Sequence, residues 1–335
     1  MTFVVHAPNI HHGGGRTLLQ ALLSELKQPT VVQLDSRFEP LAELSSEVRV
    51  VRVAPTLISR LQAERRLQSL CGCGDVVLCF GNLPPLFRSP GRVFVYLQNR
   101  YLTSSRSLAG LPWPGRLRIF IERLWLRYSL RNATVVVQTE TMAQEVREHF
   151  GREACILPFL PGEIQPSPDR ALILHDYVYV ASGEPHKNHH RLLQAWVLLA
   201  NRGFRPSLCL TLDTQRDQSL CAWVEQLARQ HNLRVTNNPL PSGQMPGLYA
   251  QSGALIYPSL FESFGVPLLE ARQAGIPIIA AERDYVRDVV APLISFDPES
   301  PLSIARAVIR HQGVIAEPAL PEDAAGFLVR LSELS

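Results

Sequence analysis

The 335-residue sequence lacks any long uninterrupted apolar run, although 46% of its residues are hydrophobic. A membrane-spanning helix needs about 18 or more consecutive apolar residues, so the sequence predicts no such helix. The first ten residues, MTFVVHAPNI, have neither the basic region nor the long apolar segment of a secretory signal peptide. We therefore expect a cytoplasmic chain.

The sequence also lacks the patterns of a zinc site or a nucleic-acid-binding surface. It has six cysteines, but Cys71 and Cys73 have no second pair at zinc-finger spacing. Without an export signal, free thiols in a reducing compartment are expected. The net charge of +3 is too small to indicate binding to nucleic acid. We expect no bound metal and no nucleic-acid partner.

The first half of the chain alternates short apolar runs with amphipathic segments, a pattern typical of parallel α/β sheets. Thr139 or Thr141 can cap the helix that follows the last of these strands. The residues from His11 to Gly15 indicate a turn. We expect strands at Phe3–Ala7, Val31–Leu34, Val48–Val53, Asp75–Phe80, Arg92–Leu97 and Ala133–Gln138, and helices at Arg16–Lys27 and Leu117–Leu130.

A proline-rich stretch, PFLPGEIQPSP at 158–168, bars both helix and central strand and predicts a linker. After it the β–α pattern restarts. We expect an N-terminal Rossmann-like domain at 1–160, a second at 161–315, and a C-terminal helix at 316–335 that packs back on the first domain. The second domain has predicted strands at Tyr177–Ala181, Ser207–Leu212, Arg234–Thr236, Ala254–Pro258 and Pro277–Ala281, and helices at Asn188–Leu199, Ser219–His231, Met245–Ala250, Pro267–Ala274 and Pro301–Gln312.

The stretch from Tyr257 to Ala281, YPSLFESFGVPLLEARQAGIPIIAA, carries the most chemistry. Glu262 follows a strand, and Glu270 lies one turn into the next helix. The amides of Phe264, Gly265 and Val266 would point from that helix N-terminus and form an anion site. Carboxylates accept hydrogen bonds from pairs of hydroxyls. Amides beside two carboxylates therefore favour a ligand that carries a diphosphate between two sugars.

These residues resemble the retaining family 4 glycosyltransferases, in which two glutamates seven residues apart lie in an E-[SG]-F-G-x-P-x-x-E-A context. The resemblance implies a GT-B fold, with two Rossmann-like domains of parallel sheets facing across a cleft. It implies that Glu262 faces the donor sugar and that Glu270 holds the nucleotide ribose. The chain has no Asp-x-Asp motif, the diphosphate–metal ligand of the other major glycosyltransferase fold. The resemblance thus implies a metal-independent reaction without a cofactor.

Further residues match the family in part. Lys187 stands where relatives place a phosphate-binding lysine, but Ser182 stands near the position of a usual arginine. The resemblance implies that Gly14 and Gly15 approach the donor phosphates from the first domain. Many relatives carry a histidine where this chain has Gln98 or Asn99, and a neutral amide there can donate to a sugar hydroxyl but cannot transfer a proton.

An arginine-rich stretch at 116–131 allows two interpretations. Between positions 100 and 131 the chain has seven arginines and one acid, Glu122, a local charge of about +6. In the first interpretation this is a surface helix whose Ile119, Phe120, Leu124 and Trp125 pack on the sheet. In the second it is a basic amphipathic surface that holds the protein at the inner membrane.

Together these patterns predict a retaining hexosyltransferase. The donor would be a nucleotide sugar, most often a GDP- or UDP-sugar, and the acceptor a glycan or a lipid-linked sugar of a bacterial O-antigen or capsule type. Two alternatives stay open: a non-catalytic sugar-nucleotide binder or scaffold, and a GT-B epimerase or phosphorylase.

Overall fold

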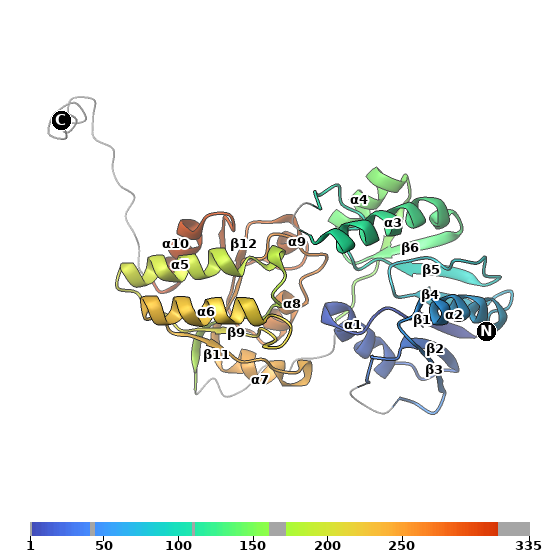
Figure 1. The fold of residues 1–335 in the computed structure, drawn as a ribbon, viewed down its shortest axis with the longest axis horizontal. Helices are drawn as coiled ribbons and strands as arrows, with labels where there is room; N and C mark the ends of the chain where they lie inside the picture. Colours follow the sequence, from blue (N-terminus) through green and yellow to red (C-terminus); the bar gives the residue numbers. More distant parts are fainter. Residues whose placement is uncertain (1, 41–43, 109–110, 161–171, 314–335) are drawn as a thin grey trace, which may run out of the picture.

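Two parallel β-sheets, each covered by helices, form two α/β domains in the computed structural model of the chain (Figure 1). The structure describes residues 2–40, 44–108, 111–160 and 172–313. The predicted C-terminal helix at 316–335 and most of the predicted linker lie outside these residues. The two predicted parallel-sheet domains are confirmed, while their boundary near residue 160 stays a prediction.

The first sheet has seven strands in the order β3-β2-β1-β4-β5-β6-β7, all paired in parallel. Its strands are β1 (Phe3–Ala7), β2 (Thr30–Asp35), β3 (Val48–Val53), β4 (Val76–Cys79), β5 (Arg92–Tyr96), β6 (Ala133–Val137) and β7 (Ala154–Ile156). The helices are α1 (Gly13–Ser24), α2 (Leu57–Leu70), α3 (Trp113–Ser129), η1 (Leu130–Asn132) and α4 (Glu140–Phe150).

The second sheet has six strands in the order β10-β9-β8-β11-β12-β13, again all parallel. Its strands are β8 (His175–Tyr179), β9 (Leu208–Leu210), β10 (Val235–Asn237), β11 (Ser252–Tyr257), β12 (Ile278–Ala281) and β13 (Ile294–Phe296). The helices are η2 (Pro185–Lys187), α5 (His189–Asn201), α6 (Gln218–His231), η3 (Ser242–Gln244), α7 (Met245–Ala250), α8 (Val266–Gln273), α9 (Asp284–Arg287) and α10 (Pro301–His311).

Both sheets reverse their strand order between the first strand and the fourth, at β1/β4 and at β8/β11. Ligands of doubly wound sheets bind outside the carboxyl ends of the strands at such reversal points. Figure 1 shows α1, which follows β1, on the side of the first domain that faces α8 of the second. The topology thus directs two ligand-binding edges toward each other.

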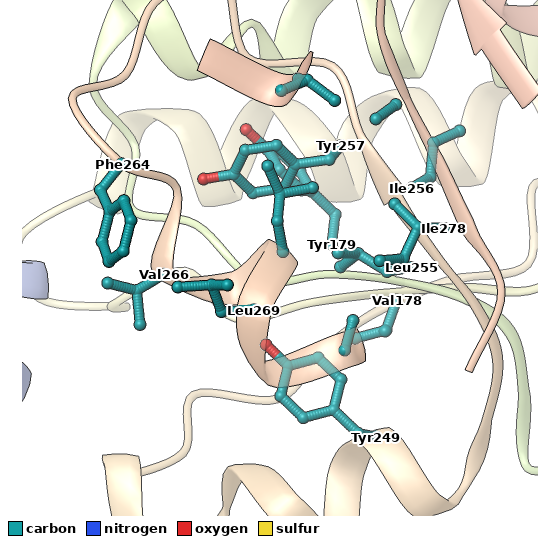
Figure 2. Close-up of a cluster of buried hydrophobic side chains, with 14 of the residues drawn as sticks. Val178, Tyr179, Tyr249, Leu255, Ile256, Tyr257, Phe264, Val266, Leu269 and Ile278 are labelled. Atoms are coloured by element: carbon teal, nitrogen blue, oxygen red, sulfur yellow. The ribbon is translucent and has the colours of Figure 1, made fainter. Parts of the chain in front are cut away.

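Buried aromatic side chains pack around the point where the second sheet reverses its strand order, between β8 and β11. Tyr179 on β8, Tyr257 on β11 and Tyr249 on α7 are at most 1% exposed, and Leu269 of α8 packs into the same cluster (Figure 2). The rings of Tyr179 and Tyr257 meet edge to face, with centroids 5.7 Å apart, a favourable geometry for aromatic pairs. This cluster fixes the start of α8 against the sheet.

The largest difference from the sequence-based expectation concerns the three glycines at 13–15. They form the first turn of α1 rather than a turn before it. Glycine is a poor helix former in a helix interior, but first-turn amides need no intrahelical partner, so the penalty there is small. The helices α2 and α9 and the strands β7 and β13 were not predicted. Thr139, one of the two predicted caps, accepts a hydrogen bond from the amide of Met142 at 3.3 Å and caps α4.

Helix α3 corrects part of the packing expected for the arginine-rich stretch. Ile119 is buried, but Phe120 is 57% exposed and Leu124 is 40% exposed. These two side chains point away from the sheet rather than onto it. Within the described residues, no helix has both the length and the apolar character needed to cross a membrane.

Candidate functional site

A cavity of about 410 Å³ lies between the two domains, at the carboxyl ends of both sheets. Its walls come from loops that follow β1, β5, β6, β8, β9 and β11. Most of the sequence-predicted site residues line this one cavity. They are Gly14, Gly15, Gln98, Ser182, Lys187, Glu262, Phe264, Gly265, Val266 and Glu270.

Two helix N-termini from different domains meet at this cavity. A Cβ placed on Gly14 of α1 would lie 3.7 Å from a methyl group of Val266 in α8, so the two helix starts lie close together. Among the described residues, no side chain caps either helix: the N-cap positions are His12 and Gly265. Uncapped first-turn amides at two helix N-termini form a strong site for an anion.

Gly265 shows why this loop requires glycine. Its φ is +71°, and a Cβ there would lie 2.9 Å from the Leu268 side chain. The left-handed conformation turns the chain sharply between β11 and α8. The turn places Glu262 before the helix and Glu270 within it, on the same cavity.

Glu262 is held by three donors. Its Oε1 accepts hydrogen bonds from Lys187 Nζ at 2.6 Å, from Ser259 Oγ at 2.7 Å and from the Tyr257 hydroxyl at 3.1 Å. Burial alone would raise the pKa of the carboxyl, but the charge of Lys187 and the other donors outweigh burial, so the pKa lies below its usual range. Glu262 is therefore an ionised, fixed acceptor at neutral pH.

Glu270 has the opposite environment. Burial raises the pKa of its carboxyl, and a hydrogen bond from the Tyr249 hydroxyl to Oε2 at 2.8 Å opposes that rise only in part. Glu270 lines the cavity, and its Oε1 has no hydrogen-bond partner among the described residues. One oxygen is thus anchored while the other can accept from a ligand hydroxyl.

The cavity contains a second cation that the sequence did not single out. Arg216, on the loop between β9 and α6, lines the same cavity as Ser182 and Lys187. Asp217 accepts from both Arg216 Nη2 at 3.2 Å and the amide of Gly183 at 3.1 Å, so it ties the two loops together. The only sequence signal was position: Arg216 follows a predicted strand by a few residues.

Gln98 and Asn99 are adjacent in the sequence but line different cavities. Gln98 lines the inter-domain cavity, and its Nε2 donates to the carbonyl of Phe80 at 2.8 Å. Asn99 lines an adjoining cavity in the first domain, which shares Gly15, His12 and Gln98 with the first. The side chain of Asn82 accepts from both backbone amides, at 2.5 Å from Gln98 and 2.9 Å from Asn99, and fixes this turn.

Residues 174–311 match the family model described as glycosyl transferases group 1. The second domain is a group 1 glycosyltransferase domain. The chain is 33% identical over 115 residues to the O-antigen chain mannosyltransferase B of Escherichia coli. It is 28% identical over 134 residues to the serotype-specific mannosyltransferase WbdA of the same organism. These matches cover 34% and 39% of this chain, and only 30% and 16% of those two proteins.

Solved structures extend the likeness to both domains of this glycosyltransferase-like chain. Anabaena HepE in complex with UDP and glucose superposes with a TM-score of 0.69 at 15% identity, covering 93% of this chain and 90% of that one. WaaG, a glycosyltransferase involved in lipopolysaccharide biosynthesis, superposes with a TM-score of 0.65 at 14% identity, covering 94% and 91%. At these identities the likeness shows the fold, and it confirms the predicted GT-B architecture.

Proposed function

We propose that this protein transfers a hexose from a nucleotide diphosphate sugar to a saccharide acceptor in bacterial surface-polysaccharide synthesis, with retention at the anomeric carbon and without a metal. The observation that carries the proposal is the meeting of two uncapped helix N-termini, Lys187, Glu262 and Glu270 around one cavity. The names of the relatives in Escherichia coli favour mannose as the sugar.

The arrangement supports a division of roles within the donor. The amides at 264–266 and at 13–15, together with Lys187, would bind the diphosphate. Glu270 would accept from the ribose hydroxyls through its free oxygen, and Glu262 would accept from a hydroxyl of the transferred sugar. Glu262 and Lys187 already contact each other, so the donor would lie across a preformed ion pair.

The proposed reaction needs no protein nucleophile. The bond from the anomeric carbon to the phosphate oxygen breaks, and the acceptor oxygen bonds to the same face of that carbon. The acceptor proton passes to the leaving phosphate oxygen, which gives a nucleoside diphosphate. The protein's contribution is positioning, together with stabilisation of the negative charge that grows on the leaving group.

The surface of α3 supports attachment to the cytoplasmic face of a membrane. Its exposed apolar side chains recur at helical spacing along one stripe, which consists of Trp113, Leu117, Phe120, Leu124 and Tyr128. Arginines flank this stripe along the same helix. An apolar stripe beside cationic side chains is the composition of an interfacial helix on anionic lipid. The fraction of protein that floats with anionic vesicles should fall as the salt concentration rises. It should also fall in the double variant Phe120→Gln/Leu124→Gln, whereas Leu293→Gln should leave it unchanged. Vesicle binding that changes with neither salt nor the double variant would contradict this attachment.

The donor is tested first by thermal shift with GDP-, UDP-, ADP- and dTDP-sugars. We expect one base to stabilise the protein, with GDP- or UDP-sugars the leading candidates. Glu270→Ala should weaken that binding, whereas Glu262→Ala should bind the donor and lose most turnover. Glu225→Ala, at an exposed position of α6, is the matched control. Donor binding without turnover on any acceptor would favour a scaffold.

The remaining alternatives differ in what they consume. An epimerase would convert the donor sugar with no acceptor present, and a phosphorylase would need inorganic phosphate. We expect the release of nucleoside diphosphate to depend on a saccharide acceptor. NMR of the product should show a linkage with the same anomeric configuration, α or β, as the donor. Inverted configuration in the product would overturn the retaining mechanism.

A further inference from the structure

The carboxyl ends of two neighbouring strands in the first sheet bring two glutamines together. Strands β5 and β6 pair in parallel, and Tyr96 opposite Val136 is the last pair of their register. Successive side chains of a strand alternate between the two faces of a sheet. Two residues beyond the last pair, the register therefore places Gln98 beside Gln138 on the same face. Both glutamines line the inter-domain cavity.

Gln138 is buried without a hydrogen bond. It is 2% exposed, and neither its Oε1 nor its Nε2 has a hydrogen-bond partner among the described residues. Burial raises the pKa of Tyr96, and the nearby Gln138 amide opposes that rise, but the Tyr96 hydroxyl donates to the carbonyl of Leu157 at 3.5 Å rather than to the amide. A buried amide that lacks both partners is costly. Its place on a cavity wall indicates a ligand that supplies a donor and an acceptor.

Gln98 adds a second acceptor beside this amide. Its Nε2 donates to the carbonyl of Phe80 at 2.8 Å, which fixes the orientation of the side chain. Its Oε1 is buried and has no partner among the described residues, and a Cβ on Gly15 would lie 3.3 Å from it. The two glutamines together thus offer one amide nitrogen as a donor and two carbonyl oxygens as acceptors.

The first domain contributes a wall without formal charge to this cavity. The described residues of that wall are His12, Gly13, Gly14, Gly15, Thr17, Leu18, Gln98 and Gln138, with no lysine, arginine or carboxylate among them. Burial, followed by the charge of His11, lowers the pKa of His12 and keeps its ring mostly neutral at pH 7. The lysine, the arginine and the carboxylates of the cavity all belong to the second domain. A neutral wall with donors and acceptors suits hydroxyl groups.

The glutamine pair lies between the proposed phosphate site and Glu262. On one side Gln98 is packed against Gly15 in the first turn of α1. On the other side Arg100, two residues after Gln98, donates to the carbonyl of Glu262 at 3.3 Å. The ionised carboxylate of Glu262 can only accept hydrogen bonds. A sugar that donates to Glu262 therefore still needs a donor for its hydroxyl oxygens, and Gln138 Nε2 is such a donor on the facing domain.

We propose that Gln138 is a specificity-determining residue that binds a hydroxyl of the transferred sugar. Its Nε2 donates to the hydroxyl oxygen and its Oε1 accepts the hydroxyl proton, while Gln98 Oε1 accepts from the adjacent hydroxyl. The first domain thus recognises the sugar from the side opposite Glu262. This rests on the proposed function, because it requires a donor sugar in the cavity. A sugar without that hydroxyl would leave a buried amide unpaired, and sites of this kind reject such analogues strongly.

The contact is tested by changing the protein and the donor together. Gln138→Met has a side chain of similar length without the amide. The donor is compared with its monodeoxy analogues, one for each hydroxyl of the sugar. In the wild type, one analogue should have a kcat/KM at least about tenfold below that of the parent donor. In Gln138→Met the same analogue should lie within about twofold of the parent donor. Penalties that are equal in the two proteins for every analogue would overturn the proposal.

Thermal unfolding gives a second measurement that a packing role would not explain. Because both amide atoms are unpaired, Gln138→Met should not lower the unfolding midpoint of the free protein. The rise in midpoint that the cognate donor causes should be smaller in this variant, whereas the rise caused by the nucleoside diphosphate, which lacks the sugar, should be unchanged. Gln144→Met, at an exposed position of α4, is the control. A lower midpoint of the free variant, with equal losses for both ligands, would assign Gln138 to packing and overturn the proposal.

The outcomes distinguish this assignment from the proposed function. If no nucleotide sugar stabilises the protein or is turned over, the proposed function fails and the assignment fails with it. If the donor is turned over but no deoxy analogue depends on Gln138, the buried amide holds only water and the assignment fails alone. If Gln138→Met raises the KM of the acceptor and leaves the donor unaffected, Gln138 contacts the acceptor, which also overturns the assignment.

Discussion

Arg100 of the first domain and Asp284 of the second are joined by two hydrogen bonds, Nη1 to Oδ1 at 3.1 Å and Nη2 to Oδ2 at 2.5 Å. The same guanidinium donates to Glu145 Oε1 at 2.8 Å and to the carbonyl of Glu262 at 3.3 Å, and it lies over the Phe261 ring at 4.8 Å. Arg100 is 7% exposed. One buried side chain thus joins both domains to the loop that carries Glu262.

We predict that Asp284→Asn lowers turnover by about tenfold or more, because small displacements of reacting groups have effects of this size. Stability should fall by no more than about 1 kcal/mol, since Asp284 is half exposed and Arg100 keeps its bond to Glu145. Arg100→Met should cost about 3 kcal/mol, because it leaves the buried Glu145 carboxylate without its cationic partner. Chemical denaturation and kcat measure both effects.

Glu282→Gln is the matched control for this bridge, because Glu282 pairs with Arg287 within the second domain alone. It should leave kcat unchanged. If Asp284→Asn and Glu282→Gln have the same small effect on kcat, Arg100 does not position the Glu262 loop.

The ion pair between Lys187 and Glu262 predicts a shift of pH dependence. In the wild type, Lys187 helps to keep the pKa of Glu262 below its usual range despite burial, so the carboxylate stays ionised as the pH falls through that range. Lys187→Met removes the strongest of the influences that lower the pKa, and burial then raises it. The acid limb of the pH–rate profile should therefore move to higher pH.

Lys187→Arg keeps the charge and separates this electrostatic effect from a loss of packing. Its acid limb should remain where the wild-type limb lies, even if kcat falls. A profile for Lys187→Met that differs from the wild type only in height, with the limb unmoved, would show that Lys187 does not set the ionisation of Glu262.

Most of the strands and much of the site could be predicted from local patterns. Continuous apolar runs marked β4 and β5, and Glu262, Gly265 and Glu270 lie in one short segment whose spacing carries its own geometry. Helix α2 was missed because it buries little, with only Ala63 and Leu67 buried along its length. Its sequence therefore has a weak helical period.

The residues that sequence reasoning missed belong to contacts between distant segments. Arg100 meets Asp284 across 184 positions, and Arg216 reaches the cavity only because β9 lies beside β8 in the sheet. No local spacing reports such a contact. The glycines at 13–15 were assigned to a turn because average helix propensity does not describe the first turn, where amides need no partner.

Arg216 predicts a compensation for the arginine absent at position 182. Arg216→Ala should weaken binding of the cognate nucleoside diphosphate by about tenfold, the loss of a hydrogen bond to a charged group, and leave the nucleoside unaffected. Adding Ser182→Arg to this variant should restore most of the affinity, because both positions line the cavity beside Lys187. Calorimetry with the two ligands measures this, with Arg229→Ala as a control. If Arg216→Ala weakens the binding of the nucleoside diphosphate and of the nucleoside equally, Arg216 does not contact the phosphates.

His189 predicts a pH dependence of stability that is separate from the chemistry. Its ring is 2% exposed at the start of α5, packs on Tyr179 with centroids 4.9 Å apart, and has no hydrogen-bond partner for either nitrogen among the described residues. Burial first, and then the charge of Lys187, lower the pKa of His189 to about 3. Below the ordinary pKa near 6.5 the unfolded chain takes up a proton that the folded chain excludes, so stability is lost as the pH falls from 6.5 toward 3. At pH 5 this loss is about 2 kcal/mol.

His189→Leu removes the titrating group. The difference in unfolding free energy between pH 7.5 and pH 5 should therefore be about 2 kcal/mol smaller in this variant than in the wild type. Urea denaturation at the two pH values measures this difference. An unchanged difference would mean that the pKa of His189 is not lowered in the folded protein.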